Sequence, residues 1–207
     1  MKLYLASANA NKAAEFRALA AELGAGRPEA GAGIEIGCAA EIGGMPAVVE
    51  DAGTFAGNAL KKARALRGRL PEGCWALADD SGLCVDALGG APGVESAYFA
   101  GPQSDPAANL AKLVDAMRGV PDGRRGAEFV CVLALAGSGG AEQLFEGRCA
   151  GRLVREPRGR GGFGYDPVFV PDGFDATVAE MPPGLKNRVG HRGRAWIECA
   201  AWLAARA

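Results

Sequence analysis

The chain has 207 residues, 49% of them hydrophobic, so it can fold around a sizeable core and does not belong to the disordered class. Its formal net charge is −1, which excludes the global positive field that nonspecific nucleic-acid binding needs. No apolar run approaches the roughly 18 residues of a membrane-spanning helix. We therefore expect neither nucleic acid nor a membrane as a partner.

The first half of the chain alternates short apolar runs with helical patterns. Residues 3–6 are typical of a short buried strand, and residues 11–23 predict a helix. A loop rich in Gly, Pro and Ala at 24–33 and a weak strand at 34–36 follow. Residues 54–67 predict a second helix, with its threonine as the N-cap.

The second half continues this alternation. Two short apolar runs flank a double aspartate at 75–85, and residues 105–117 predict a helix that opens on Asp-Pro. Residues 129–136 and 143–148 predict a hairpin, and a strand at 167–170 and a helix at 191–205 end the chain. Interleaved helices and strands indicate an α/β fold with a mixed sheet, as one domain over 1–207 without a linker. The central hairpin could project as a second lobe around a cleft.

Six cysteines occur without a C-x-x-C pair, several of them in strand-like apolar runs. We interpret them as reduced thiols that are buried as small hydrophobic side chains. The N-terminus begins a strand at once and lacks a signal-peptide pattern. The reduced thiols and the lack of a signal-peptide pattern both predict a cytoplasmic protein.

The double aspartate, Asp79 and Asp80, lies between apolar runs and is followed by Ser81. Carboxylates near a core are costly unless cations or several donors compensate them, which makes the pair a candidate metal or acid/base site. The alternative is a surface turn, because Asp-Ser-Gly favours turns. A second acidic pair, Glu50 and Asp51, adds hard oxygen ligands that suit Mg²⁺.

Two lysines lie on the apolar stripes of predicted helices. Lys12 closes the segment 7–12, a strand-to-helix junction whose backbone N–H groups favour an anion. The alternative there is an ordinary N-cap with a solvated lysine. Lys62 shares a helical face with Asn58 and either snorkels or points at an anion in a cleft.

Two later segments could contact a nucleotide base. In the glycine-rich loop 161–167, Phe163 could lie flat against a base or plug the core instead. Residues 186–193 hold Lys186, Arg192 and the only histidine, His191, at the start of the last helix. This basic and polar stretch fits an anion or base-edge site better than a core.

In their order and approximate spacing, these segments resemble the bacterial members of the inosine triphosphate pyrophosphatases, also described as dITP/XTP pyrophosphatases. The motifs are Ser7-x-Asn9-x-x-Lys12-x-x-Glu15, Asn58-Ala59-x-x-Lys62-Ala63, Ala78-Asp79-Asp80-Ser81-Gly82-Leu83, Gly89-Gly90-Ala91-Pro92-Gly93, Phe163-Gly164-Tyr165-Asp166-Pro167, Lys186 and His191-Arg192-Gly193. The match spans nearly the whole chain. Any one motif is weakly specific, whereas six motifs in register, with Lys186 between the last two, are strongly specific.

The resemblance implies an elongated mixed sheet with flanking helices, two lobes around a central cleft, and a homodimer. It also implies a hydrolase that cleaves ITP, dITP or XTP to the monophosphate and pyrophosphate with Mg²⁺ as cofactor. It makes Asp80 the proton acceptor and a metal ligand, with Asp79 beside it and Glu50 as a second metal ligand. It places substrate contacts at Ser7, Ala8, Asn9, Ala10, Asn11, Lys12, Lys62, Ser81, Phe163, Gly164, Tyr165, Asp166, Lys186, His191 and Arg192.

The chain departs from the family pattern at four points. Gly57 replaces the usual Glu before Asn-Ala, and the acidic segment 50–55 is one residue shorter than usual. Tyr98 stands where the family often has Arg, and Gly190 where it has Ser. These departures affect the expected metal ligands and the rim of the site.

Two other functions could use the same residues. A related Maf-like pyrophosphatase would prefer pyrimidine or modified nucleotides, although the Phe-Gly-Tyr-Asp and His-Arg segments point away from it. A non-catalytic nucleotide-binding or RNA-binding module would gain nothing from the double aspartate.

Overall fold

The computed structural model describes residues 1–26 and 34–206, with the side chains of 23–26 left aside. Six strands form one mixed sheet in the order β2-β1-β3-β4-β5-β6, in which β1 is parallel to β2 and β3 and β6 is antiparallel to β5. The strands are β1 Lys2–Leu5, β2 Glu35–Cys38, β3 Trp75–Val85, β4 Gly126–Ala136, β5 Glu142–Leu153 and β6 Phe169–Pro171. The predicted α/β fold with a mixed sheet is confirmed.

The helices also follow the sequence pattern. They are α1 Ala10–Gly26, α3 Phe55–Arg67, α4 Pro106–Ala116, α5 Pro183–Val189 and α6 His191–Ala204. Thr54 caps α3 by accepting a hydrogen bond from the Gly57 N–H, as predicted. Helix α5 was not predicted. Of the predicted loop at 24–33, residues 27–33 lie outside the described residues.

The double aspartate lies inside β3, which continues without a break from Trp75 to Val85. The alternative of a surface turn is therefore wrong. Asp79 is 1% exposed and Asp80 is 7% exposed, so both carboxylates are buried and need compensating groups.

The chain divides into two compact units, and β3, β4 and β5 each contribute residues to both. The first unit comprises Met1–Asp80, Cys131–Gly147 and Gly193–Ala207, and the second comprises Ser81–Val130 and Arg148–Arg192. The single domain inferred from the sequence stays a prediction.

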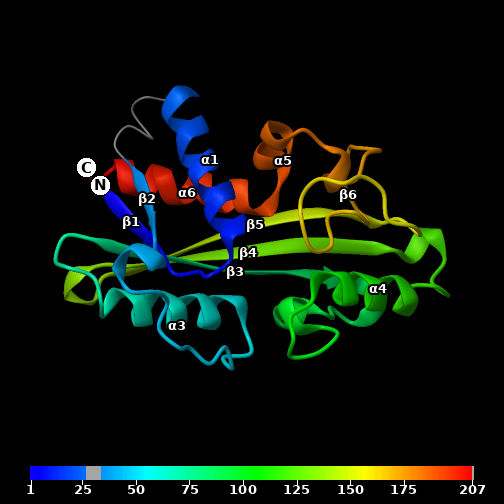
Figure 1. Ribbon diagram of the computed structural model, residues 1–207. Coiled ribbons are helices and arrows are strands. Elements are labelled where there is room, and N and C mark those ends of the chain that lie inside the picture. The colour runs from blue at the N-terminus through cyan, green and yellow to red at the C-terminus, as the bar shows by residue number, and fades with distance from the viewer. Residues whose placement is uncertain (27–33, 207) are drawn as a thin grey trace. The chain divides into compact units, whose positions relative to one another are not determined.

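The first unit packs helices on both faces of its strands. Figure 1 shows α1 and α6 on one face and α3 on the other. Its core joins Phe16 of α1 to Trp196 of α6, with ring centroids 5.9 Å apart, over Leu77 of β3. Burial of these large side chains supplies most of the driving force for folding this unit.

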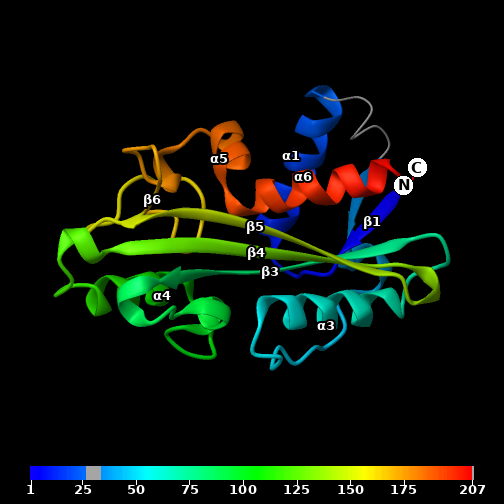
Figure 2. The same cartoon turned by 180° about the vertical axis from the view of Figure 1, so that it is seen from behind.

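The second unit has its own core. Leu83 of β3, Met117 after α4 and Phe169 of β6 lie in this cluster and are fully buried. Figure 2 shows α4 on one face of the strands and α5 on the other. No helix in the described part of the chain is long and apolar enough to span a membrane. All six cysteines are free thiols, of which Cys131, Cys149 and Cys199 are buried.

Candidate active site

In the first unit, Asp79 is held by two side chains from distant parts of the chain. The Lys12 ammonium, from the first turn of α1, forms an ion pair with Oδ1 of Asp79. The Cys131 thiol of β4 donates to Oδ2 over 3.4 Å. The side chain of Lys12 is only 16% exposed, so the alternative of a solvated lysine is wrong.

Asp80 pairs with a second lysine, Lys62 of α3, and α3 lies on the face of the strands opposite α1. The Lys62 Nζ lies 2.6 Å from Oδ1 of Asp80 and 2.9 Å from Oε2 of Glu50. The Asn58 amide, one helical turn earlier, lies 3.5 Å from Oδ2 of Asp80, at the outer limit of a hydrogen bond. Of the two alternatives for Lys62, snorkelling to solvent is therefore wrong, because its ammonium is buried and faces two carboxylates.

Burial and neighbouring charges shift the pKa values of Asp80 and Glu50. Burial raises the pKa of Asp80 to about 6, because it penalises the carboxylate more than Lys62 compensates it. Burial also acts to raise the pKa of Glu50, but its hydrogen bond with Lys62 and the lysine charge outweigh this and lower it. Glu50 therefore ionises first, and Asp80 titrates near neutral pH, as a proton acceptor requires.

The segment before α3 aims Glu50 at this position. Oδ1 of Asn58 accepts a hydrogen bond from the Ala52 N–H at 3.0 Å, and Lys61 donates to the Val49 carbonyl at 3.3 Å. A Cβ built on Gly57 would lie 2.5 Å from the Cβ of Ala52. The shortened segment 50–55 thus occupies the space into which a side chain at position 57 would project. This packing accounts for two departures from the family pattern together, the shortened segment and Gly57.

The two carboxylates of Glu50 and Asp80 fit a small hard cation. Both carboxylates approach one ammonium group, so their oxygens point into one small volume. Mg²⁺ takes one or two protein carboxylates and completes its shell with phosphate oxygens and water. Within residues 1–26 and 34–206, no group of three or more His, Cys, Asp or Glu side chains is arranged to hold a metal. A metal here would therefore complete its shell with oxygens from a substrate or from water.

At the junction before α1, the geometry is that of an N-cap. Oδ1 of Asn9 accepts hydrogen bonds from the N–H groups of Asn11 and Lys12, and Ser7 Oγ accepts from the Asn9 N–H. Residues 8–11 are exposed. The alternative of an ordinary N-cap with a solvated lysine is therefore right about the cap and wrong about the lysine. An anion bound here would meet exposed polar groups beside Lys12, which points inward.

In the second unit, Asp166 organises the glycine-rich loop. Its Oδ2 accepts from the Phe163 N–H at 2.8 Å and pairs with Lys186 of α5 at 2.9 Å. The Lys186 Nζ also lies 4.8 Å from the centroid of the Phe163 ring, and the Arg192 guanidinium lies 5.3 Å from it. Phe163 is half-buried under two cations, so it does not plug the core of this unit.

Arg192 and His191 are both buried at the start of α6. Arg192 donates to Oγ of Ser81 at 2.8 Å, and His191 stacks on Phe129 with ring planes 9° apart. Tyr165 is buried as well, and its hydroxyl donates to the Ser96 carbonyl at 2.8 Å. The side chain of Tyr165 therefore serves the core, and its carbonyl accepts a hydrogen bond from the Val168 N–H at 3.1 Å.

Sequence reasoning missed two residues that contact this set. Cys131 and Phe129 lie in the apolar strand β4, where no pattern distinguishes a residue that touches a functional side chain from one that only fills space. Only the pairing of β4 beside β3 brings them close.

Comparison with known proteins agrees with this geometry. The family model described as the Ham1 family matches residues 3–202. A dITP/XTP pyrophosphatase of Opitutus terrae is 61% identical over 98% of both chains, and one of Nocardia farcinica is 45% identical over 99% of this chain and 95% of its own. The solved structure of the Staphylococcus aureus Ham1 protein covers all of both chains with a TM-score of 0.83 at 30% identity. By sequence and by fold, the chain belongs to the Ham1 family.

Proposed function

We propose that this protein hydrolyses ITP, dITP and XTP to the nucleoside monophosphate and pyrophosphate with Mg²⁺, and so removes deaminated purines from the nucleotide pool. The observation that carries the proposal is a pair of adjacent buried carboxylates, each bonded to a lysine from a different helix. Relatives that are 61% and 45% identical bear the name dITP/XTP pyrophosphatase, which supports it.

The first unit would hold the phosphates. Lys12 and Lys62 are cations in low-dielectric surroundings, where they interact with a polyanion more strongly than in water. The half-buried Ser7 and the exposed polar groups of 8–11 would add hydrogen bonds. Such fixed charges lower the barrier to phosphoryl transfer because they need no reorganisation as charge moves.

Asp80 and Glu50 would hold Mg²⁺. When bound, Mg²⁺ would neutralise phosphate charge and acidify a coordinated water. Asp80 is the better proton acceptor of the two aspartates, because burial raises its pKa to about 6 and its lysine is shared with Glu50. We assign Asp79 to holding Lys12 in place and Asp80 to accepting the proton from the attacking water.

The second unit would hold the base. Arg192 and His191 would donate to the 6-oxo group of hypoxanthine or xanthine, which adenine lacks, and a buried donor left unpaired is costly. Guanine shares the 6-oxo group and would be rejected through its 2-amino group. Phe163 would stack on the ring of any purine, and Lys186 would keep Phe163 and Asp166 in position.

The deciding experiment measures pyrophosphate release from ITP, XTP, dITP, GTP, ATP and a pyrimidine triphosphate, with Mg²⁺ and with EDTA. We expect rapid release from the first three in Mg²⁺ and none in EDTA. A preference for pyrimidine or modified nucleotides would instead support the Maf-like alternative. Tight ITP binding without release would support a non-catalytic module.

Three further properties belong to the same proposal. We propose a homodimer, a cytoplasmic location and a single functional domain built from both units. Six free thiols are consistent with a reducing compartment. Light scattering coupled to size-exclusion chromatography tests the dimer, because the monomer mass is 21.1 kDa.

A further inference from the structure

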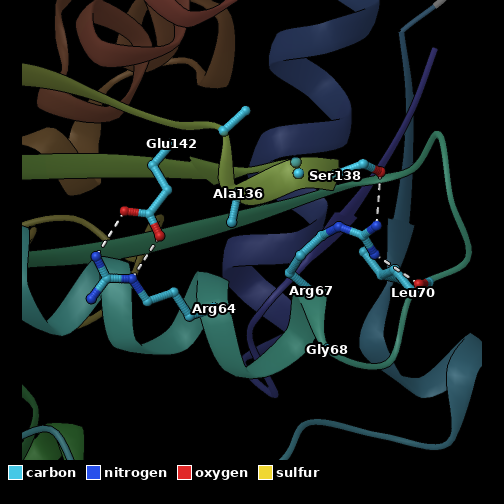
Figure 3. A pocket seen from close by; sticks show the side chains of 11 residues that line it. Arg64, Arg67, Gly68, Leu70, Ala136, Ser138 and Glu142 are labelled. Atoms are coloured by element: carbon cyan, nitrogen blue, oxygen red, sulfur yellow. Dashed lines mark hydrogen bonds and ion pairs between the residues drawn. The ribbon is translucent and has the colours of Figure 1, made fainter.

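A hollow at the C-terminal end of α3 involves none of the candidate active-site residues. It has a volume of about 480 Å³ and lies within the first unit. Its walls come from Arg64 and Arg67 of α3, from Leu70 just beyond the helix, and from the turn 136–142 between β4 and β5 (Figure 3). Lys62 and Arg64 are two residues apart, hence roughly 200° around the helix, so α3 presents the two cations on different faces.

Arg67 is a cation without an acidic partner. Its Nη1 donates to the Leu70 carbonyl at 2.7 Å and its Nη2 to Oγ of Ser138 at 2.8 Å, both neutral acceptors (Figure 3). Its Nε is buried and has no hydrogen-bond partner in the described structure. No carboxylate among residues 1–26 and 34–206 lies within ion-pair distance of this guanidinium. A guanidinium that no carboxylate compensates favours an anionic ligand, which its Nη atoms would contact.

Arg64 supplies a second guanidinium, which a surface carboxylate holds. Its Nε and Nη2 donate to the two oxygens of Glu142 at 2.6 and 2.7 Å. The Arg64 side chain is 58% exposed, and an exposed ion pair contributes little to stability, so a ligand can compete with Glu142 at small cost. The lining carries two positive charges and one negative charge, a net charge of +1.

Two features of the backbone keep the hollow suitable for an anion. The carbonyls of Arg64 and Leu66, at the negative end of the helix, accept hydrogen bonds from the Gly68 N–H, which reduces their repulsion of an anion. Gly139 and Gly140 have φ values of 67° and 80°, and a Cβ built on either would meet nothing within 4 Å. Both glycines line the hollow, and the space that their side chains would occupy is open.

We propose that this hollow is a second anion site, in which Arg67 binds a phosphate group. Arg64 points away from Arg67, toward Glu142 (Figure 3), and would turn to join the phosphate while Glu142 competes for it. Guanidinium forks match phosphate oxygens in pairs, and the Ser138 hydroxyl would turn from Arg67 to the ligand. The lining contains no aromatic residue, so the site selects the phosphate group and not a base. The source is either free phosphate or a small phosphate ester.

Titration of the ¹⁵N-labelled full chain with inorganic phosphate or ribose 5-phosphate, at constant ionic strength, tests this site by NMR. We expect saturable shifts of the amides of 64–70 and 138–142. Arg67→Gln should weaken binding about tenfold, because it removes a charge-assisted contact. Glu142→Gln should strengthen binding about two- to fivefold, because it removes the competitor. Tighter binding of one probe identifies free phosphate or an ester as the ligand.

Arg69→Gln is the matched control, since Arg69 is close in sequence but does not line the hollow. It should leave affinity unchanged, and Arg67→Gln should keep pyrophosphate release from ITP, which shows that the variant is folded. The proposal is overturned if phosphate shifts only the amides of 7–12, if Arg67→Gln binds like the parent, or if Glu142→Gln does not bind more tightly. A chain that binds phosphate here but fails to hydrolyse ITP would refute the proposed function alone.

Discussion

Asp80 is the residue on which the proposed chemistry depends most directly. Asp80→Asn keeps the shape of the side chain and the neighbouring Glu50–Lys62 pair, but it removes the proposed proton acceptor and metal ligand. We expect ITP turnover to fall by about 10²- to 10⁴-fold, the usual effect of losing a general base. Steady-state kinetics measure the loss, and circular dichroism checks the fold.

Asp51→Asn provides the control for that variant. Asp51 is adjacent to Glu50 but exposed, and it pairs with Lys61. Its loss should change turnover by less than about twofold, because exposed ion pairs contribute little. Equal losses in the two variants would show that general charge, not the position of Asp80, sustains activity.

Cys131 is a positioning residue that acts through Asp79 and Lys12. Cys131→Ala removes the thiol that donates to Asp79, and with it one of the bonds that hold this carboxylate and its Lys12 partner in position. If Lys12 grips phosphates, the KM for ITP should rise about three- to tenfold, the equivalent of one net hydrogen bond, with a smaller change in kcat. Cys131→Ser keeps a donor and should restore the KM.

Cys199→Ala separates this effect from general loosening of the core. Cys199 is fully buried in the same unit, in α6, but packs only in the hydrophobic core. Its truncation should lower the thermal unfolding temperature without moving the KM. A KM rise as large as that of Cys131→Ala would remove Cys131 from substrate positioning.

At the scale of elements, the segment before α3 and the first turn of that helix act together. Gly57→Ala would place a Cβ 2.5 Å from the Cβ of Ala52 and 3.0 Å from Oγ1 of Thr54, so the segment that carries Glu50 must shift. We expect a cost of about 1–3 kcal/mol in unfolding free energy and a higher Mg²⁺ concentration for half-maximal activity. Chemical denaturation and Mg²⁺ titration of turnover measure the two effects.

Gly68→Ala is matched to it at the other end of α3. A Cβ there meets only carbonyl oxygens at 3.6 and 3.9 Å, which is ordinary contact. Both substitutions gain up to about 1 kcal/mol from alanine's higher helix propensity, but only Gly57→Ala adds the clash. An unchanged Mg²⁺ requirement in Gly57→Ala would separate Glu50 from metal binding.

Element by element, periodicity predicted more than local chemistry did. The apolar stripes located α1, α3, α4 and α6 and directed Lys12 and Lys62 inward, because a helix that packs on a sheet must bury one face. The turn alternative for Asp79 and Asp80 failed because the Asp-Ser-Gly sequence favours a turn only where no other group compensates the negative charges of the two aspartates. The compensating lysines come from 67 and 18 residues away, which no local window contains.

The short helix α5 shows the opposite limit. Its seven residues, Pro183–Val189, carry too few apolar positions to establish a period, and only Pro183 near its start signals a helix. The same limit applies to Phe129 and Cys131, whose contacts depend on which strands are neighbours. Site residues that depend on pairing over long sequence distances were therefore the ones that sequence alone could not identify.

At the scale of the whole molecule, each unit has its own core and its own set of candidate ligands. The cations near Asp79 and Asp80 suit phosphates, whereas Phe163 and Arg192 suit a base. A triphosphate with a purine base would satisfy both sets, and each half of that substrate should satisfy one set only.

Hydrogen–deuterium exchange with three ligands tests this division. The imido analogue of ITP with Mg²⁺ should slow amide exchange in 7–12 and 58–62 of the first unit and in 163–166 and 186–192 of the second. At a ligand concentration 100 times the Kd, the slowing should reach about a hundredfold where opening excludes the ligand. Pyrophosphate with Mg²⁺ should protect only the first pair of segments, and inosine only the second.

Because Pro106–Ala116 of α4 holds none of the candidate ligands, its fast-exchanging amides serve as the internal reference. Protection of one unit by the intact analogue would contradict a substrate held by both, whereas protection of both by pyrophosphate alone would assign the basic residues of the second unit to phosphate instead of base.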